Sequence, residues 1–146
     1  MKPTNKLFAN VPTTVFAVMS ALANEHDAVN LGQGFPDTDG PDWIRGIAAK
    51  ALMDGPNQYP PMFGVPALRE AVAAANKRFY GLDINPATEV MVTSGATEAL
   101  MDCCLALLNP GDEAIVIEPF YDSYPLQIKT AGGIPRYVRL EAPDWT

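Results

Sequence analysis

The stretch that decides the fold runs from Glu89 to Tyr124 and reads EVMVTSGATEALMDCCLALLNPGDEAIVIEPFYDSY. Its two continuous apolar runs, residues 90–92 and 114–117, predict strands that are covered on both faces, as in parallel sheets. Between them, residues 97–108 are apolar on nearly every side and predict a buried helix, which the sequence Asn-Pro-Gly-Asp ends. This strand–helix–strand order predicts a right-handed crossover within a doubly wound α/β sheet.

The flanking sequence extends this α/β pattern in both directions. We expect two further strands, at residues 29–31 and 135–140, and four further helices, at residues 13–25, 41–55, 66–81 and 124–131. Pro41 and Pro66 suit the first position of a helix, and Gly81 suits the left-handed position that follows a helix end. Two segments rich in glycine and proline, GQGFPDTDGP and NQYPPMFGVP, predict loops.

Composition and charge exclude several classes of protein. The 146 residues suffice for one modest core, and with 48% apolar and 18% charged residues the chain is globular rather than disordered. The net charge of −7 argues against a nucleic-acid partner and against an anionic membrane surface. No apolar run approaches the roughly 20 residues of a membrane span, and the N-terminal segment lacks the continuous apolar core of a signal peptide. We therefore expect a cytoplasmic protein.

The two cysteines, Cys103 and Cys104, are adjacent in the sequence. Neighbouring residues of a helix point in different directions, so a disulfide between them is not expected, and the chain has no third thiol with which to build a zinc cluster. We expect both cysteines to act as small apolar residues of a helix.

A turn of small residues, TSGAT, joins the first strand of this stretch to its helix. The backbone N–H groups of Gly95, Ala96 and Thr97 would have no partner within the helix and would point outward at the positive end of its dipole. Such a turn can bind an anion such as a phosphate, with a further bond from the Thr97 hydroxyl, and Glu98 can cap it. By itself the pattern also fits an ordinary, well-capped connection, and it is neither a Walker loop nor the dinucleotide fingerprint.

Aromatic residues follow the second strand, in the sequence Glu-Pro-Phe-Tyr. Ligands of open α/β sheets bind beyond the carboxyl ends of the strands, and Ala96 and Tyr121 both follow such ends. A ring at Tyr121 could stack on a planar heterocycle whose phosphate lies in the turn at Ala96. Alternatively, Phe120 and Tyr121 merely cover the end of the sheet.

Five segments in order make a family recognisable: TTVFAVMSALA, NLGQGFPD, NQYPPMFGVPALREAV, VTSGATEAL and IEPFYDSY. Over residues 11–140 the chain resembles the N-terminal portion of class I/II, fold-type I aminotransferases that depend on pyridoxal 5'-phosphate (PLP), in the branch of methionine and kynurenine (glutamine-type) aminotransferases. The resemblance implies the start of the large three-layer PLP-transferase domain, a mainly parallel sheet with helices on both faces. Residues 1–40 would form an N-terminal arm, helix and substrate loop, part of the small domain or active-site lid. Residues 41–146 would form the truncated first part of the large domain.

The resemblance implies roles for five residues at the cofactor. Gly95, Ala96 and Thr97 match the backbone cradle for the PLP phosphate, and Tyr121 matches the ring that stacks on the pyridine. Tyr59 matches the tyrosine that reaches the phosphate of the neighbouring subunit's cofactor, which implies a homodimer. For Tyr59, packing within its own loop is the alternative.

For the substrate, the resemblance implies that Gly34 lies along the carboxylate and that Phe16 lines the side-chain pocket, although Phe16 also fits a helix core. The implied reaction moves an amino group between an L-amino acid of methionine, aromatic or glutamine type and a 2-oxo acid. An N-succinyldiaminopimelate aminotransferase is the alternative, because QGFPDTDGP and NQYPP also occur in proteins of that name. Two further alternatives are a non-catalytic remnant that binds a phosphate ligand and a nucleotide-binding α/β module, which would leave GQGFPD and NQY unexplained.

The resemblance also implies groups that this chain does not supply. Family members are well over twice as long, and their cofactor-binding lysine, the asparagine and aspartate for the pyridine ring, and the carboxylate-binding arginine lie downstream of the matched region. None of the five lysines has the family's context; they are Lys2, Lys6, Lys50, Lys77 and Lys129. We therefore expect a fragment or truncated reading frame that has no transaminase activity alone and whose uncovered sheet makes it poorly soluble or partly molten.

Overall fold

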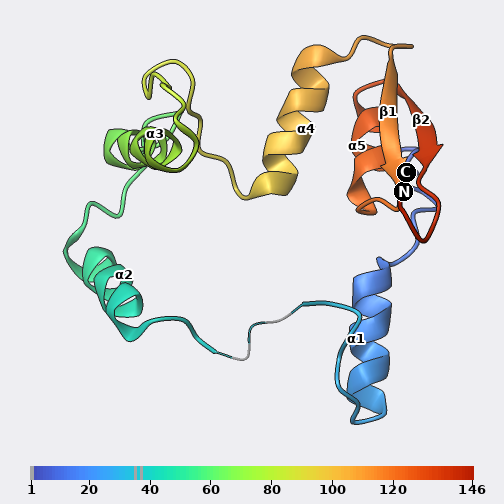
Figure 1. Cartoon of the computed structure of the whole chain (residues 1–146), viewed down its shortest axis with the longest axis horizontal. Coiled ribbons are helices and arrows are strands. Elements are labelled where there is room, and N and C mark those ends of the chain that lie inside the picture. Colours follow the sequence, from blue (N-terminus) through green and yellow to red (C-terminus); the bar gives the residue numbers. More distant parts are fainter. Residues whose placement is uncertain (1, 35, 37) are drawn as a thin grey trace. The chain divides into compact units, whose positions relative to one another are not determined.

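The computed structural model describes residues 2–34, 36 and 38–146, so two residues of the predicted GQGFPDTDGP loop, Phe35 and Asp37, lie outside the described residues. The elements follow one another along the described chain (Figure 1) as α1 (Val15–Glu25), α2 (Asp42–Asp54), α3 (Pro66–Tyr80), α4 (Ala96–Leu107), β1 (Glu113–Glu118), α5 (Ser123–Thr130) and β2 (Ile134–Arg139). None of these helices is both long enough and apolar enough to cross a membrane.

Contacts divide the chain into two units. We name Thr93–Thr146, together with the N-terminal segment up to Thr14, the sheet unit, and we name Val15–Val92 the helical unit. The N-terminal segment is tied to the rest of the sheet unit by the Thr14 hydroxyl, which donates a hydrogen bond to the carboxylate of Asp122. The functional division predicted at residue 40 is a separate matter and stays a prediction.

The sheet unit is a parallel β–α–β crossover preceded by a helix. β1 and β2 are parallel, with Val116 opposite Tyr137, and α5 connects them. α5 packs on both strands, and α4 packs on α5. Val116 of β1 and Pro125 and Ile128 of α5 are buried apolar side chains among the described residues. The strands predicted at 114–117 and 135–140 and the helices predicted at 97–108 and 124–131 are confirmed.

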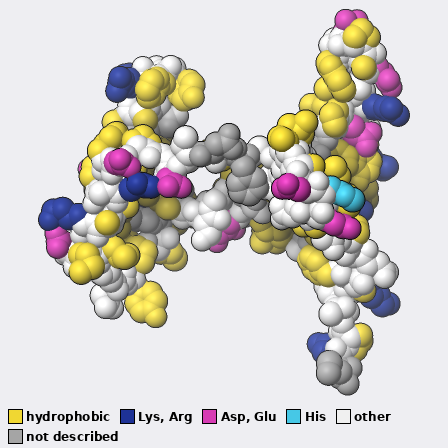
Figure 2. All heavy atoms as spheres, turned by 90° about the horizontal axis from the view of Figure 1, so that it is seen from below, with side chains coloured by type: hydrophobic (Ala, Val, Ile, Leu, Met, Phe, Trp, Pro, Cys, Tyr) yellow, Lys and Arg dark blue, Asp and Glu magenta, His cyan; other side chains and the backbone are white. Residues whose placement is uncertain are grey.

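The described residues do not give these elements the burial that their apolar sequences indicate, and the sheet is partly uncovered, as expected for this chain. Ile115 and Ile117 are 73% and 55% exposed, and no residue of α4 is buried. Among the described elements only α5 packs on the sheet, so the second covering layer that the apolar runs predict is not formed. Figure 2 shows groups of hydrophobic side chains on the surface. Folded monomeric proteins normally expose fewer such groups.

Two predicted strands do not form within the described residues. Residues 29–31 and 90–92 are both irregular. A strand exists through a ladder of backbone hydrogen bonds to a neighbour, and the segment at 90–92 has one such bond to another segment, from Val92 N–H to the Phe63 carbonyl at 3.1 Å. An apolar, β-branched sequence therefore does not become a strand where its partner strand is missing.

The helical unit contains three helices close to their predicted positions. α3 begins at Pro66, as expected, and Gly81 ends it in the left-handed conformation with φ 71°. α2 begins at Asp42, one residue later than predicted, because Pro41 has extended backbone (φ −62°, ψ 131°) and takes the N-cap position. α1 begins at Val15, two residues later than predicted.

Candidate functional site

The turn before α4 has an open and unusual backbone. Gly95 is the N-cap of α4 with φ 85° and ψ 172°, a conformation that is essentially restricted to glycine. Apart from Gly95 and its two chain neighbours, no described residue has an atom within 4 Å of the position where a Cβ would stand on Gly95. The first backbone hydrogen bond at this end of α4 is donated by Ala99 N–H to the Gly95 carbonyl at 3.4 Å. The N–H groups of Ala96 and Thr97 therefore have no acceptor within the helix.

Internal hydrogen bonds hold this turn in shape. Gly95 N–H donates to the Thr93 carbonyl at 2.8 Å, and the Thr93 hydroxyl donates to the Gly95 carbonyl at 3.0 Å. The carboxylate of Glu98 does bond back to this turn, but it accepts from Ser94 N–H and not from the N-cap residue Gly95, three residues before it, as the sequence predicts. Because the Gly95 N–H is already engaged, an anion would take its backbone donors from Ala96 and Thr97, and Gly95 would contribute through its conformation.

Glu98 is expected to stabilise the start of α4 through its charge. Glu98→Gln keeps an acceptor for Ser94 N–H but removes the negative charge from the positive end of the helix. We expect a loss of about 0.3–1 kcal/mol in the free energy of unfolding, measured by urea denaturation. Asp102→Asn, on the same helix beyond its first turn, is the matched control and should lose less. Equal losses for both variants would show that the cap contributes nothing specific.

The two aromatic residues that follow β1 make different ring contacts, although both line the same groove. The Phe120 ring stacks on the Tyr137 ring of β2, with centroids 5.5 Å apart, so this residue covers the sheet end as the alternative interpretation proposed. Tyr121 is 44% exposed, meets the edge of the Tyr124 ring at 5.6 Å and lines an apolar groove with Leu100 of α4. Phe120 and Tyr124 line the same groove, and Tyr121 is the most exposed of these three rings.

The same groove contains one of the two cysteines. Cys104 lines it, and burial, followed by the neighbouring Cys103, raises the pKa of the Cys104 thiol. A raised pKa keeps this thiol protonated and therefore a weak nucleophile. Both cysteines are free, in agreement with the expectation that they form no disulfide.

A buried glutamine lies between the turn and the groove, and the sequence reasoning missed it. Gln127 of α5 is 7% exposed, and its side-chain Nε2 donates to the Thr97 carbonyl at 2.9 Å. It lines the Tyr121 groove and also a second cavity, lined by Ser94 and Glu98. One glutamine among several polar residues of α5 gives no signal that could have identified this contact.

The other predicted site residues belong to the helical unit. Phe16 is half-buried on α1, Gly34 is exposed, and Tyr59 is 98% exposed. The structure brings Ala96, Thr97 and Tyr121 into one unit and these three residues into the other. Their approach to the turn therefore stays a prediction.

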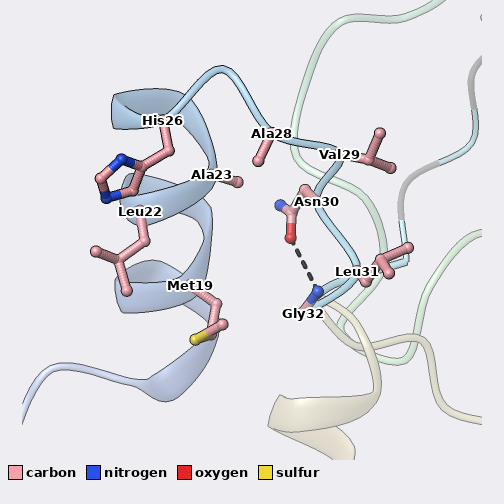
Figure 3. Close-up of a pocket in the computed structure, with 9 residues that line it drawn as sticks. All are labelled: Met19, Leu22, Ala23, His26, Ala28, Val29, Asn30, Leu31 and Gly32. Atoms are coloured by element: carbon pink, nitrogen blue, oxygen red, sulfur yellow. Dashed lines mark hydrogen bonds between the residues drawn. The ribbon is translucent and has the colours of Figure 1, made fainter.

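The helical unit also anchors the loop that carries Gly34. Figure 3 shows Asn30 beside α1, where its Oδ1 accepts a hydrogen bond from Gly32 N–H at 3.0 Å and its Nδ2 donates to the Ser20 hydroxyl at 3.0 Å. A Cβ on Gly32 would stand 2.6 Å from Met19 Cβ, so only glycine fits this close approach to the helix. Sequence reasoning placed Asn30 in a strand and gave Gly32 no role.

The sequence matches known proteins along most of its length. Residues 26–146 match the model of the family described as aminotransferase class I and II. The chain is 55% identical over 120 residues to the "Probable N-succinyldiaminopimelate aminotransferase" of Mycobacterium tuberculosis, which covers 82% of the chain and 30% of that protein. It is 46% identical over 147 residues to the methionine aminotransferase of Escherichia coli, which covers 98% of the chain and 38% of that protein.

Solved structures show the same relationship. A protein of Escherichia coli with a methionine aminotransferase function superposes with a TM-score of 0.90 at 46% identity, over 98% of this chain and 37% of that one. The chain thus spans about a third of the length of the relatives it matches. The expected fold is confirmed as the α/β start of the PLP-transferase domain. With a family model that matches most of its residues, the chain belongs to the class I and II aminotransferases.

Proposed function

We propose that this chain provides the phosphate-binding and ring-stacking part of the pyridoxal 5'-phosphate site of a transaminase. The observation that carries the proposal is the start of α4, where Ala96 and Thr97 offer N–H groups that have no acceptor within the helix. The residues fit the phosphate end of the cofactor, because the open space at Gly95 lets an anion approach the turn closely. The apolar groove at Tyr121, in the same unit, suits a flat heterocycle.

Each proposed residue would either position the cofactor or stabilise its charge. Ala96 and Thr97 would hold the phosphate through backbone N–H groups, and the Thr97 hydroxyl would add a further bond. The Tyr121 ring would lie against the pyridine and fix its plane. Tyr59, whose side chain is almost fully exposed, would reach the cofactor phosphate of a second copy in a homodimer. When bound, the cofactor supplies the electron sink for amino-group transfer.

The proposed reaction moves an amino group between an L-amino acid and a 2-oxo acid. Methionine, aromatic and glutamine-type donors are proposed first, because relatives include a methionine aminotransferase and a kynurenine–oxoglutarate transaminase. An N-succinyldiaminopimelate aminotransferase is the second candidate, supported by the 55% identity to the Mycobacterium tuberculosis protein. Gly34 would lie along the substrate carboxylate, and Phe16 would line the pocket for its side chain.

The 146 residues alone are expected to show no transamination. Lys50 and Lys77 form ion pairs with Asp54 and Asp83 in the helical unit, and none of the chain's lysines has the family's context for binding the cofactor. The purified chain would be incubated with PLP, methionine and a 2-oxo acid, and the new 2-oxo acid would be measured. Reproducible turnover at a rate above that of free PLP would contradict this expectation.

A chimera tests whether the chain builds the cofactor site. The chain would replace the matching segment of the Escherichia coli methionine aminotransferase, which is 38% of that protein. We expect the chimera to bind PLP and to transaminate methionine. A chimera that folds and dimerises like its parent but does not bind PLP would refute the proposal and favour a non-catalytic remnant.

The amino donor would be identified by capturing the protein from its source with an antibody to residues 41–146 and assaying methionine, kynurenine, glutamine and N-succinyldiaminopimelate.

A further inference from the structure

Gln127 connects the two halves of the proposed cofactor site. Its amide is more than nine-tenths buried, and it donates to the carbonyl of Thr97, thirty residues earlier in the chain. The donor atom Nε2 and the acceptor oxygen are 2.9 Å apart, the normal length of such a bond. Thr97 stands in the first turn of α4, beside the N–H groups that are proposed to bind the phosphate. The bond therefore attaches that turn to α5.

The same helix begins directly after the aromatic residue of the site. α5 starts at Ser123, two residues after Tyr121, and packs on both strands of the sheet. Gln127 is also the residue that lines both the cavity beside Ser94 and Thr97 and the groove beside Tyr121. The distance from a phosphate to a pyridine ring is fixed within one small molecule. The turn at Thr97 and the Tyr121 ring can bind both ends of the cofactor at once only if the separation between turn and ring is fixed as well.

We propose that Gln127 is a positioning residue that sets the separation between the phosphate-binding turn and the Tyr121 ring. This inference rests on the proposed function, because it concerns the same site. Gln127 would not touch the cofactor itself; it would act through the Thr97 carbonyl. Loss of its N–H donor would leave the Thr97 carbonyl with one bond fewer and allow the start of α4 to shift relative to α5.

Two substitutions test this role. Gln127→Met keeps the length of the side chain and removes the donor, and we expect the dissociation constant for PLP to rise about tenfold. Gln127→Glu restores a donor only when the introduced carboxyl is protonated, so its binding defect should shrink as the pH falls. The dissociation constants would be measured for the chimera by absorbance, with the unsubstituted chimera measured at every pH.

Thr130→Val is the matched control. It removes another side-chain bond to a backbone carbonyl on α5, from the Thr130 hydroxyl to Leu126 at 2.7 Å, but this bond does not reach the turn. We expect Thr130→Val to bind PLP as the unsubstituted protein does. Gln127→Met with unchanged PLP affinity, or Gln127→Glu with a defect independent of pH, would overturn the positioning role. Failure of the unsubstituted chimera to bind PLP would instead refute the proposed function itself.

Discussion

Gly95→Ala is expected to weaken PLP binding by the chimera by about tenfold to a hundredfold, which corresponds to about 1–3 kcal/mol of backbone strain. The methyl group itself meets no obstacle, because no described residue other than Gly95 and its two chain neighbours has an atom within 4 Å of the Cβ position. The penalty arises from the backbone, since φ 85° with ψ 172° is a conformation that alanine avoids. The turn would relax to a different path, and the N–H groups of Ala96 and Thr97 would change direction. A titration of the cofactor-free chimera with PLP measures the effect.

Gly81→Ala separates this effect from a general loss of stability. Gly81 also has positive φ, 71°, and open space around its Cβ position, but it ends α3 in the helical unit. We expect Gly81→Ala to lower the free energy of unfolding by about 1 kcal/mol and to leave the PLP affinity unchanged. Equal PLP affinities for the two variants would show that the conformation of Gly95 has no part in cofactor binding.

Gly64→Ala is expected to destabilise the helical unit by about 2–5 kcal/mol, because two penalties combine. Gly64 has φ 97°, and a Cβ there would stand 2.4 Å from Val92 Cγ2 and 2.7 Å from Val92 Cβ. The neighbour cannot move away freely, because Val92 N–H is bonded to the carbonyl of Phe63. Urea denaturation monitored by circular dichroism would measure the loss.

A double substitution divides the Gly64→Ala effect into its two causes. Val92→Gly removes both atoms that the new methyl group would strike, but it leaves the strain of the positive φ. The combined Gly64→Ala and Val92→Gly variant should therefore lose less stability than the sum of the two single variants. Strict additivity would mean that the contact with Val92 contributes nothing and that backbone strain alone sets the loss.

Local signals in the sequence were sufficient for most elements of this chain. The helix starting at Pro66 and ending at Gly81 could be predicted because its cap residues determine its own backbone. The strand at residues 90–92 could not, because a strand also depends on a partner, and periodicity in one segment says nothing about the other. Ile115 is exposed for the same reason, because its burial depends on a second layer that the described residues do not form over the sheet.

The features of the candidate site also fall into those that local sequence predicts and those that it does not. The open start of α4 could be predicted, because TSGAT and the capping Glu98 act within a few residues of each other. The engagement of the Gly95 N–H by Thr93 and the bond from Gln127 to Thr97 could not. The first depends on the exact torsion angles of the turn, and the second joins residues that meet only after α5 has packed against α4.

The interrupted sequence of the sheet unit has a consequence for synthesis on the ribosome. The segment up to Thr14 emerges before the helical unit, but Asp122, to which Thr14 donates, emerges only after the whole of Val15–Val92 has been made. The helical unit is one continuous stretch and can fold while translation continues. The N-terminal segment must wait unpaired throughout, so its docking is a late, non-local event, and a chaperone or protease would have its longest access there.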